Sequence, residues 1–404
     1  MRKRFGDSAA KPAALFLTPE APYPLAGGGQ MRSASLLEYL AKHFHVDVIV
    51  FREPGAADPV CAIPSGLVRE IKVISLPYHS KQFHARALRN FGRVAREVPP
   101  LVDRFSGFDA QIAAFLHGRS YQTAVVEHFW CATYADTVQR HSEKTILDLH
   151  NVESVLLARC AESERWPGSL LFRRFGRACA QLERKWFPRF STLMVSSTTD
   201  RDAVAGIAGH PQVIVYPNAI PRVPLPAAAK REEIVFAGNF DYHPNRAAIR
   251  YFHEQIWPGL RDRFPSLKWT LVGRNHEDME RRLSGDPRIQ FTGPVRDAVS
   301  RMASARLAVV PLLAGSGTRI KIIEAWAAGL PVVSTSLGAE GLPAQPGKDL
   351  LIADNPRDFI EAVASVLESE TLREALSRSG RLLYETQLTW AAAWETLNGF
   401  IIET

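Results

Sequence analysis

The chain has 404 residues, more than one typical hydrophobic core holds, so we expect two domains. Its content of 46% hydrophobic and 23% charged residues is that of a globular protein and excludes a disordered or fibrous one. The net charge of +7 favours phosphorylated substrates or an anionic membrane surface, and no recognisable nucleic-acid-binding module accompanies it.

Targeting signals are weak in this sequence. The apolar stretch after the basic N-terminus is short and soon meets Pro19, so it is a poor signal peptide, and no apolar run approaches the roughly 20 residues that cross a bilayer. The four cysteines lack metal-ligand spacing, which favours reduced thiols. We therefore expect a cytoplasmic protein, either free or peripheral on the inner membrane face.

The N-terminal region has the pattern of a Rossmann-like βαβ unit. Apolar runs predict a strand over residues 13–17, a helix over 31–43 and a strand over 46–50. The loop before the helix contains Gly28 and Gly29, but its glycines do not have the dinucleotide-binding spacing GxGxxG. With Arg32 in the first helical turn, this loop suits a diphosphate, and a flexible turn is the alternative.

Two later strands end in histidines. The apolar runs 123–126 and 145–149 are followed by Glu127-His128 and His150-Asn151. Ligands bind at the carboxyl ends of strands in open parallel sheets, so we expect His128 and His150 to converge on one site. A structural role for either histidine is the alternative.

Two segments combine arginines with apolar residues at helical spacing. Residues 82–104 and 168–190 are both predicted to be basic amphipathic helices. Such helices can lie on an anionic membrane, or pack one face into the core and expose the other.

A proline-rich segment, residues 220–230, separates two stretches of alternating strands and helices and is the best linker. Alternation on both sides predicts an α/β fold with two doubly wound domains. We expect a first domain over 1–219, a second over 231–386, and a C-terminal helix over 387–404 that packs back on the first domain.

The stretch 306–342 contains the clearest ligand-binding pattern: a strand, a glycine-rich turn, a helix and a second strand. A helix N-terminus binds phosphate through free N–H groups and the helix dipole. Arg319 and Lys321 add positive charge there, and Glu324 could accept two hydrogen bonds from a ribose. An ordinary turn with a solvated glutamate is the alternative.

Asp200-Arg201-Asp202 has the spacing of a metal-binding DxD motif but lies where a helix is expected to begin. Acidic residues are common in the first turn of helices, so we expect no metal at this motif.

Taken together, these motifs resemble the retaining glycosyltransferases of family 4, group 1, which have the GT-B architecture. The matching segments are Pro22 to Arg32, Glu127-His128, residues 148–153, 216–218, 236–239, 272–273, 291–293 and 315–331. The resemblance implies two Rossmann-like domains, with the donor nucleotide bound to the second domain and the acceptor mainly to the first.

The resemblance also implies roles for single residues in the second domain. Glu324 matches the glutamate that binds the donor ribose. Ser316 stands where the family carries a sugar-contacting glutamate, so backbone N–H groups of Gly317 and Thr318 are the expected sugar contacts. Asn239 replaces the family's phosphate-binding arginine, which shifts the expected clamp to Arg319 and Lys321.

The remaining matches complete the expected site. Gly28, Gly29, Arg32, Gly238 and Gly273 join the expected nucleotide-sugar site. By the same resemblance, His128 lies near the acceptor and the anomeric carbon, and His150 is the second candidate.

The predicted reaction is metal-independent sugar transfer, with retention, from a UDP- or GDP-sugar to a glycan or lipid-linked acceptor. It would serve the synthesis of a cell-surface polysaccharide or a glycolipid. Two alternatives remain: a GT-B sugar-nucleotide epimerase, and a catalytically degenerate GT-B protein that acts as a binding scaffold.

Overall fold

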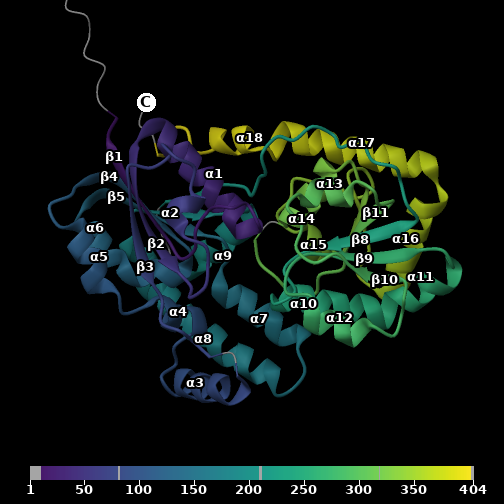
Figure 1. Cartoon of the computed structure of the whole chain (residues 1–404), viewed down its shortest axis with the longest axis horizontal. Coiled ribbons are helices and arrows are strands. Elements are labelled where there is room, and N and C mark those ends of the chain that lie inside the picture. Colours follow the sequence, from purple (N-terminus) through teal and green to yellow (C-terminus); the bar gives the residue numbers. More distant parts are fainter. Residues whose placement is uncertain (1–10, 81, 209–211, 318, 402–404) are drawn as a thin grey trace, which may run out of the picture.

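The computed structural model describes residues 11–80, 82–208, 212–317 and 319–401, which form two α/β lobes lying side by side (Figure 1). The ends of the chain at 1–10 and 402–404, including the basic N-terminus discussed above, lie outside the described residues.

The first lobe is built on a parallel sheet with the strand order β3-β2-β1-β4-β5-β6-β7. Its strands are β1 (Ala13–Thr18), β2 (His45–Arg52), β3 (Glu70–Ser75), β4 (Tyr121–Glu127), β5 (Ser142–Leu149), β6 (Thr192–Val195) and β7 (Val213–Val215). Helices cover both faces, so the central strands are almost continuously apolar, as in β1 and β6.

The helices of this lobe include the long antiparallel pair α7 and α8. In chain order they are α1 (Gly28–His43), α2 (Pro59–Ala62), α3 (Phe83–Ala95), α4 (Pro100–Phe105), α5 (Asp109–Leu116), η1 (Phe129–Tyr134), α6 (Ala135–Gln139), α7 (Glu153–Ser163), α8 (Gly168–Trp186), η2 (Phe187–Arg189) and α9 (Thr198–Ala208). No helix in the described ranges combines the length and the apolar character needed to cross a bilayer.

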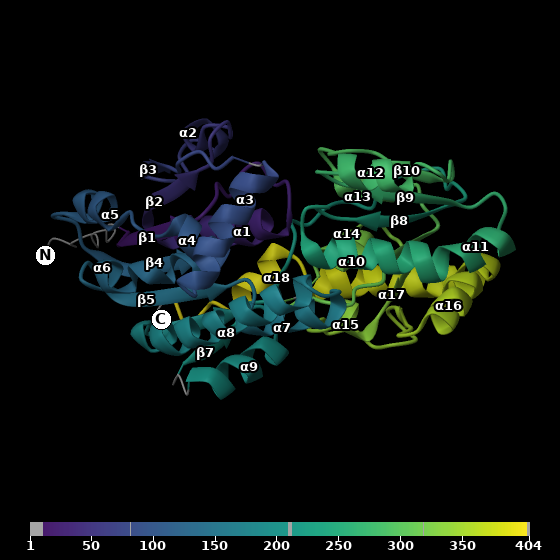
Figure 2. The ribbon, with the colours of Figure 1, turned by 90° about the horizontal axis from the view of Figure 1, so that it is seen from below.

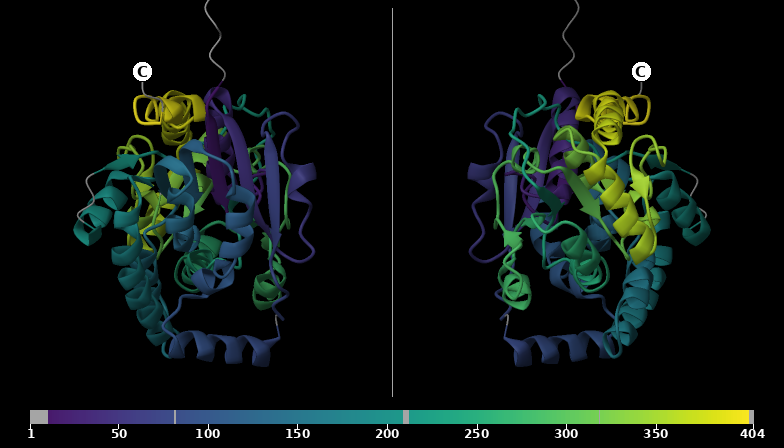
Figure 3. Two further views of the ribbon diagram at one scale, coloured as in Figure 1. Left: turned by 90° about the vertical axis from the view of Figure 1, so that its left-hand side faces the viewer. Right: turned by 90° about the vertical axis from the view of Figure 1, so that its right-hand side faces the viewer.

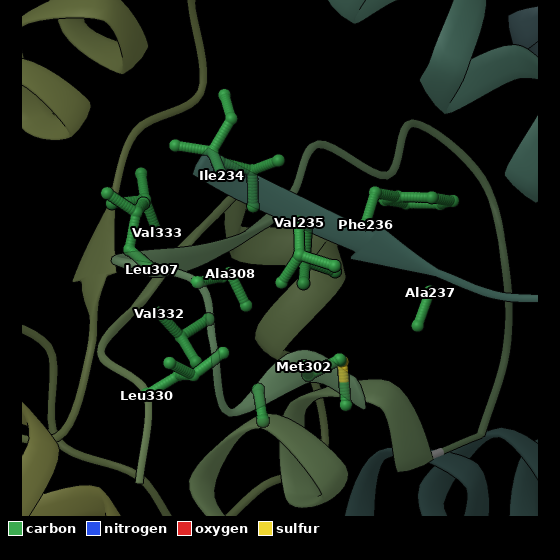
Figure 4. Close-up of a cluster of buried hydrophobic side chains, with 14 of the residues drawn as sticks. Ile234, Val235, Phe236, Ala237, Met302, Leu307, Ala308, Leu330, Val332 and Val333 are labelled. Atoms are coloured by element: carbon green, nitrogen blue, oxygen red, sulfur yellow. The ribbon is translucent and has the colours of Figure 1, made fainter. Parts of the chain in front are cut away.

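The second lobe repeats this plan with the parallel order β10-β9-β8-β11-β12-β13. Its strands are β8 (Glu233–Ala237), β9 (Lys268–Val272), β10 (Ile289–Phe291), β11 (Leu307–Val310), β12 (Val332–Ser334) and β13 (Leu351–Ile352). Figure 4 shows side chains of β8, β11 and β12 packed with Met302 and Leu330 in its core.

The last two helices of the second half of the chain lead back to the first lobe. The helices of this half are α10 (His243–Tyr251), the π-helical turn η3 (Phe252–Ile256), α11 (Trp257–Arg263), α12 (Glu277–Leu283), α13 (Ala298–Met302), α14 (Ile320–Ala327), α15 (Ser336–Ala339), α16 (Pro356–Glu368), α17 (Glu370–Gln387) and α18 (Trp390–Glu395). The expected pair of doubly wound α/β sheets is confirmed.

Strand order reverses at the same point in both sheets, between β1 and β4 and between β8 and β11. Loops leaving the carboxyl ends of such strands flank the usual ligand crevice of this topology. The glycine-rich β1–α1 loop and His128 therefore share one sheet edge, and the loops after β8 and β11 share the other. The two lobes turn these edges toward each other (Figure 2).

The segment after α17 returns to the first lobe (Figure 1). Trp390 is buried in the core of the first lobe, and Trp394 Nε1 donates to the carbonyl of Ser35 at 3.0 Å. The C-terminal helix predicted over 387–404 is shorter than expected, since α18 covers only Trp390–Glu395.

The basic segment 82–104 is not one helix, as predicted, but two. Helix α3 ends at Ala95, Glu97 takes a positive φ of 53°, and α4 starts at Pro100. Proline lacks the N–H that continues a helix but fits its first turn, so Pro99-Pro100 ends one helix and begins the next. Figure 3 shows α3 at the outer edge of the molecule.

Candidate functional site

The first domain contributes a stacked pair of histidines. His128 directly follows β4 with a positive φ of 62°, and His150 directly follows β5. The ring of His128 lies between Trp130 and His150, with centroid distances of 4.2 Å and 3.5 Å. The two strand-end histidines predicted to converge do so.

Neighbouring carboxylates give the two histidines different charges. His150 Nε2 lies 3.0 Å from Glu127 Oε2 and 3.4 Å from Asp148 Oδ2. Burial alone would lower the pKa of His150, but these carboxylates outweigh it and raise the pKa to about 9. Burial, and then the charge of His150, hold the pKa of His128 well below its usual range. A cationic His150 therefore stacks on a neutral His128.

The charge of His150 links stability to pH. Because its folded-state pKa of about 9 exceeds the usual 6.5, its contribution is fully present below pH 6.5 and is lost as the pH rises through about 9. We expect His150→Gln to lower the free energy of unfolding by on the order of 1–3 kcal/mol below pH 6.5, and by less above pH 9. Urea unfolding across this range, with the exposed His45→Gln as control, measures the difference. If the difference in free energy of unfolding between wild type and His150→Gln does not become smaller as the pH rises, the charge assigned to His150 is wrong.

Arg32 does not fit the predicted diphosphate role. Its guanidinium is buried and donates to Asp148 through Nε (2.8 Å) and Nη2 (2.5 Å), and to Tyr216 O and Asn218 Oδ1 through Nη1 (2.6 and 3.0 Å). These bonds engage four of the five guanidinium N–H groups of a buried side chain, which leaves little of it available to a ligand. Arg32 instead ties α1 to the ends of β5 and β7, a role that sequence spacing could not reveal.

Glu127, His128 and His150 are also the one group among the described residues that could hold a metal ion, since their ligand atoms lie within 4.8 Å of one another. A metal would compete for His150 Nε2, which already faces Glu127 Oε2 and carries the proton of the imidazolium. Protonated histidine is not a metal ligand, so the arrangement favours the charged network over a metal.

The second domain contributes Lys321 from the first turn of α14. Its ammonium donates to Asn245 Oδ1 at 2.5 Å and lies 4.1 Å from the ring centroid of Phe236. Burial, and then the nearby Arg319, lower the pKa of Lys321 to about 7. The absence of a carboxylate hydrogen-bonded to this ammonium, among the described residues, leaves it suited to an anionic ligand.

Glu324 lies one turn further along α14. Its carboxylate forms no hydrogen bond or ion pair with the residues that the structure describes, and burial raises its pKa to about 7. A half-buried carboxylate beside a cation, at a sheet edge where ligands bind, is a strong candidate for contact with a diol.

The predicted glycines after β8 and β9, Gly238 and Gly273, lie where the backbones of two loops approach each other closely. A Cβ at Gly273 would lie 1.8 Å from the carbonyl oxygen of Gly238, and one at Gly238 would lie 3.2 Å from Lys321 Nζ. Glycine is therefore required at Gly273, where φ is 149° and the close atom belongs to the backbone. Asn239 holds its own loop, with Oδ1 accepting from Asp241 N (3.1 Å) and from Asn275 Nδ2 (2.8 Å).

Arg319 was predicted as part of the phosphate clamp, but its guanidinium folds into the preceding loop. Nη1 donates to the carbonyls of Ser316 and Gly317, and the side chain is buried. A Cβ at Gly315, whose φ is 144°, would lie 2.6 Å from Arg319 Nη2. Arg319 therefore shapes the glycine loop. Thr318, an expected sugar contact, lies outside the described residues.

Ser316 makes a contact between the domains. Its hydroxyl donates to Asp200 Oδ1 at 3.0 Å and accepts from Val152 N at 3.2 Å, both on the first domain. A Cβ at Gly317, with φ of 75°, would lie 2.6 Å from the carbonyl oxygen of His150. The loop predicted to contact the donor sugar thus lies against the end of β5, and the Ser316 hydroxyl is occupied there.

The two glycine loops lie close together. A Cβ at Gly28 would lie 3.5 Å from the side chain of Ile320, the first residue of α14, and one at Gly27 would lie 3.5 Å from Arg274 Nη2. Of the predicted residues, the structure therefore gathers Gly28, Gly29, His128 and His150 on one edge. On the facing edge it gathers Gly238, Gly317, Lys321 and Glu324.

Sequence reasoning missed Asp148 and Asn245. Asp148 is a charged residue inside an apolar strand, which was an available signal for a buried ion pair. Asn245 carried no comparable signal, because an asparagine near a helix start is ordinary. Only the tertiary structure brings its amide to Lys321.

Part of the chain matches a known family. A family model described as Glycosyl transferases group 1 matches residues 231–369. A phosphatidyl-myo-inositol mannosyltransferase of Mycobacterium leprae is 31% identical over 183 residues, which cover 44% of this chain and 45% of the relative. The chain thus spans less than half of that relative's length.

Solved structures with the same fold cover nearly the whole chain. Sucrose-phosphate synthase from Thermosynechococcus elongatus superposes with a TM-score of 0.71 at 16% identity, covering 95% of this chain and 97% of the other. Anabaena HepE in complex with UDP and glucose superposes with a TM-score of 0.63 at 13% identity, covering 96% and 98%. The whole chain thus has the GT-B fold, and residues 231–369 match the group 1 glycosyltransferases. The predicted architecture is confirmed, and the segment that the family model matches contains Lys321 and Glu324.

Proposed function

We propose that this protein transfers a sugar from a UDP- or GDP-sugar to a glycan or lipid-linked acceptor, with retention and without a metal ion. The observation that carries the proposal is the placement of Lys321 and Glu324 on neighbouring turns at the N-terminal end of α14. This end is where a helix offers free N–H groups and a positive dipole to phosphate.

In this proposal the diphosphate leaving group lies against Lys321 and the loop N–H groups before α14. The Lys321 ammonium and the N–H dipoles stabilise the negative charge that develops as the sugar–phosphate bond breaks. Glu324 accepts hydrogen bonds from the ribose hydroxyls. The acceptor approaches from the first-domain edge that carries His128 and His150, and no protein nucleophile takes part.

The comparisons support this proposal through what the relatives' names state. One structural neighbour was solved with UDP and glucose, and the M. leprae relative is named a mannosyltransferase. Both descriptions fit a nucleotide-sugar donor, and the second fits a lipid-linked acceptor.

Calorimetry with UDP and with GDP tests the proposal first, and binding of neither would favour a scaffold protein. A donor screen with mass detection then tests for transfer, and a sugar epimerised without acceptor would favour the epimerase. We expect the product to keep the anomeric configuration of the donor, which proton NMR coupling reports. We expect EDTA to leave transfer unchanged.

Glu324→Ala is expected to weaken nucleotide binding by about 10- to 100-fold, because ribose hydroxyls lose a charged hydrogen-bond acceptor worth about 1.5–3 kcal/mol. Calorimetry with the nucleotide that the wild type binds measures this change. Glu374→Ala, which removes an exposed glutamate on α17, serves as control. If wild type and Glu324→Ala bind the nucleotide with equal affinity, Glu324 does not contact the nucleotide.

We also propose peripheral attachment to an anionic membrane through α3 and the start of α8. Large apolar side chains are exposed here: Leu88 at 74% and Phe91 at 75% on α3, Trp166 at 81% just before α8, and Leu170 at 60% in α8. Arginines, including the exposed Arg86 and Arg173, flank them. Exposed apolar side chains among basic ones suit an interface rich in anionic lipid.

Flotation with vesicles containing phosphatidylglycerol tests this attachment at low salt. We expect wild-type protein to float and the double variant Leu88→Ser, Phe91→Ser to float less, because two apolar anchors are lost. Leu382→Ser, which changes an exposed leucine on α17, is the matched control. Failure of the wild type to float, or equal flotation of all variants, would count against the surface.

A further inference from the structure

The glycine loop before α14 is held on one side by its own domain. Arg319 Nη1 donates to the carbonyls of Ser316 and Gly317, so both carbonyls face the guanidinium. The peptide bond between Ser316 and Gly317 is trans and planar, so the Gly317 N–H points away from the Ser316 carbonyl. This N–H has no hydrogen-bond acceptor among the described residues, which leaves it available to a ligand.

The first domain holds the same loop from the other side. The Ser316 hydroxyl donates to Asp200 Oδ1 at 3.0 Å and accepts from Val152 N at 3.2 Å. Arg159 Nη1 donates to the carbonyl of Gly315 at 2.8 Å. Groups of the first domain thus fix two consecutive residues of a loop that belongs to the second domain.

Asp200 is itself fixed at the start of α9. Its Oδ2 accepts from the hydroxyls of Ser196 and Ser197 at 3.0 and 2.7 Å. Its backbone N–H donates to Ser197 Oγ at 3.1 Å, so Ser197 caps the N-terminus of the helix. Asp200 is 6% exposed, and with Oδ2 bound inside its own domain it presents Oδ1 to Ser316.

The hydrogen bond between Ser316 and Asp200 is of a strong kind. A charged acceptor makes a hydrogen bond roughly twice as strong as a neutral one, and both side chains are buried. Asp200 also places a negative charge near Arg319. The loop is therefore fixed jointly by a carboxylate of one domain and a guanidinium of the other.

We propose that Asp200 is a positioning residue for the donor: through Ser316 it holds the Gly317 N–H in place for the diphosphate. This inference rests on the proposed function, in which the loop N–H groups contact the donor's diphosphate. It gives a role to the first aspartate of the Asp200-Arg201-Asp202 motif. Ser316, which stands where the family carries a sugar-contacting glutamate, becomes the link between the loop and a carboxylate of the other domain.

Calorimetry with UDP, or with GDP if the wild type binds that nucleotide, measures the expected effect. Asp200→Ala and Ser316→Ala should each weaken binding by about tenfold, the loss of one hydrogen bond to a charged group. The double variant should bind no more weakly than the single ones, because both substitutions break the same link. Asp200→Asn keeps one oxygen acceptor and should lose less affinity. Asp202→Asn, at the 73% exposed side chain of the same motif, is the matched control.

A second measurement needs no nucleotide. Labelling with ¹³C′-serine and ¹⁵N-glycine selects the amide signals of glycines that follow a serine, and the signal that Ser316→Ala removes belongs to Gly317. In the free protein, Asp200→Ala should shift this signal, because it releases the Ser316 hydroxyl 116 positions away. Asp202→Asn should leave the signal where it is in wild type.

Any of three results would overturn the proposal. In the first, Ser316→Ala, which leaves the cap of α9 intact, binds the nucleotide like wild type. In the second, the losses add up in the double variant, which means that Asp200 acts only on its own helix. In the third, Asp200→Ala does not move the Gly317 signal, so Asp200 does not hold the loop. Failure of the wild type to bind UDP and GDP would instead sink the proposed function, and the Gly317 signal would still report on the contact.

Discussion

Replacing Lys321 by alanine is expected to lower kcat of sugar transfer by about 10²- to 10³-fold, the typical loss when one preorganised electrostatic contact is removed from a transition state. Lys321 is the cation best positioned for the diphosphate, because Arg319 is bound to loop carbonyls and Arg32 to Asp148. The side chain is held by Asn245 and Phe236, so it needs little reorganisation when charge develops.

Steady-state kinetics with the donor found by screening measures this effect. Lys321→Arg should retain part of the activity, because the charge remains while the geometry changes. Lys348→Ala, which removes an exposed lysine of the same domain, should leave kcat unchanged. Full activity in Lys321→Ala would show that another group carries the leaving-group charge.

Replacing Arg32 by alanine is expected to lower the free energy of unfolding by about 3–5 kcal/mol. The substitution leaves the Asp148 carboxylate buried without its main partner, and an uncompensated buried charge has a cost of this size. Arg32 is 2% exposed and Asp148 is fully buried, so the carboxylate is not solvated at the protein surface. The substitution also removes the hydrogen bond from Arg32 Nη1 to the carbonyl of Tyr216, which holds the end of β7.

Urea unfolding followed by tryptophan fluorescence measures this loss. Arg189→Ala is a suitable control, because it breaks a surface ion pair with Asp136 that is worth about 0–1 kcal/mol. Arg32→Ala could instead keep wild-type stability and bind UDP more weakly. That result would contradict the structural role of Arg32 and support the diphosphate-binding role predicted from the sequence.

The fold was predictable because its determinants are local. Buried parallel strands produce continuous apolar runs, and prolines mark the segment between β7 and β8. These signals depend on a few neighbouring residues. Helix ends were less accurate: the predicted 82–104 helix is broken between Ala95 and Pro100, and the C-terminal helix is shorter than the predicted 387–404.

Residues of the candidate site were predictable where their positions follow from a single helix or from neighbouring strands of one sheet. Lys321 and Glu324 follow a glycine turn on one helix, so their spacing alone places them on neighbouring turns. His128 and His150 follow neighbouring strands, so the sheet brings them together. The charge of each histidine was not predictable, because it depends on how Glu127 and Asp148 are buried around them.

The sequence by itself determined that this chain forms two doubly wound domains with a phosphate-binding pattern on the second. The tertiary structure alone decided which cations are available. Arg32, Arg319 and Lys321 are equivalent as sequence signals. In the structure, however, Arg32 binds the carboxylate of Asp148, 116 positions away, and Arg319 binds carbonyls of its own loop. The reason is physical: a charge acts on a ligand only if no nearer partner neutralises it, and that partner is chosen by packing between distant segments.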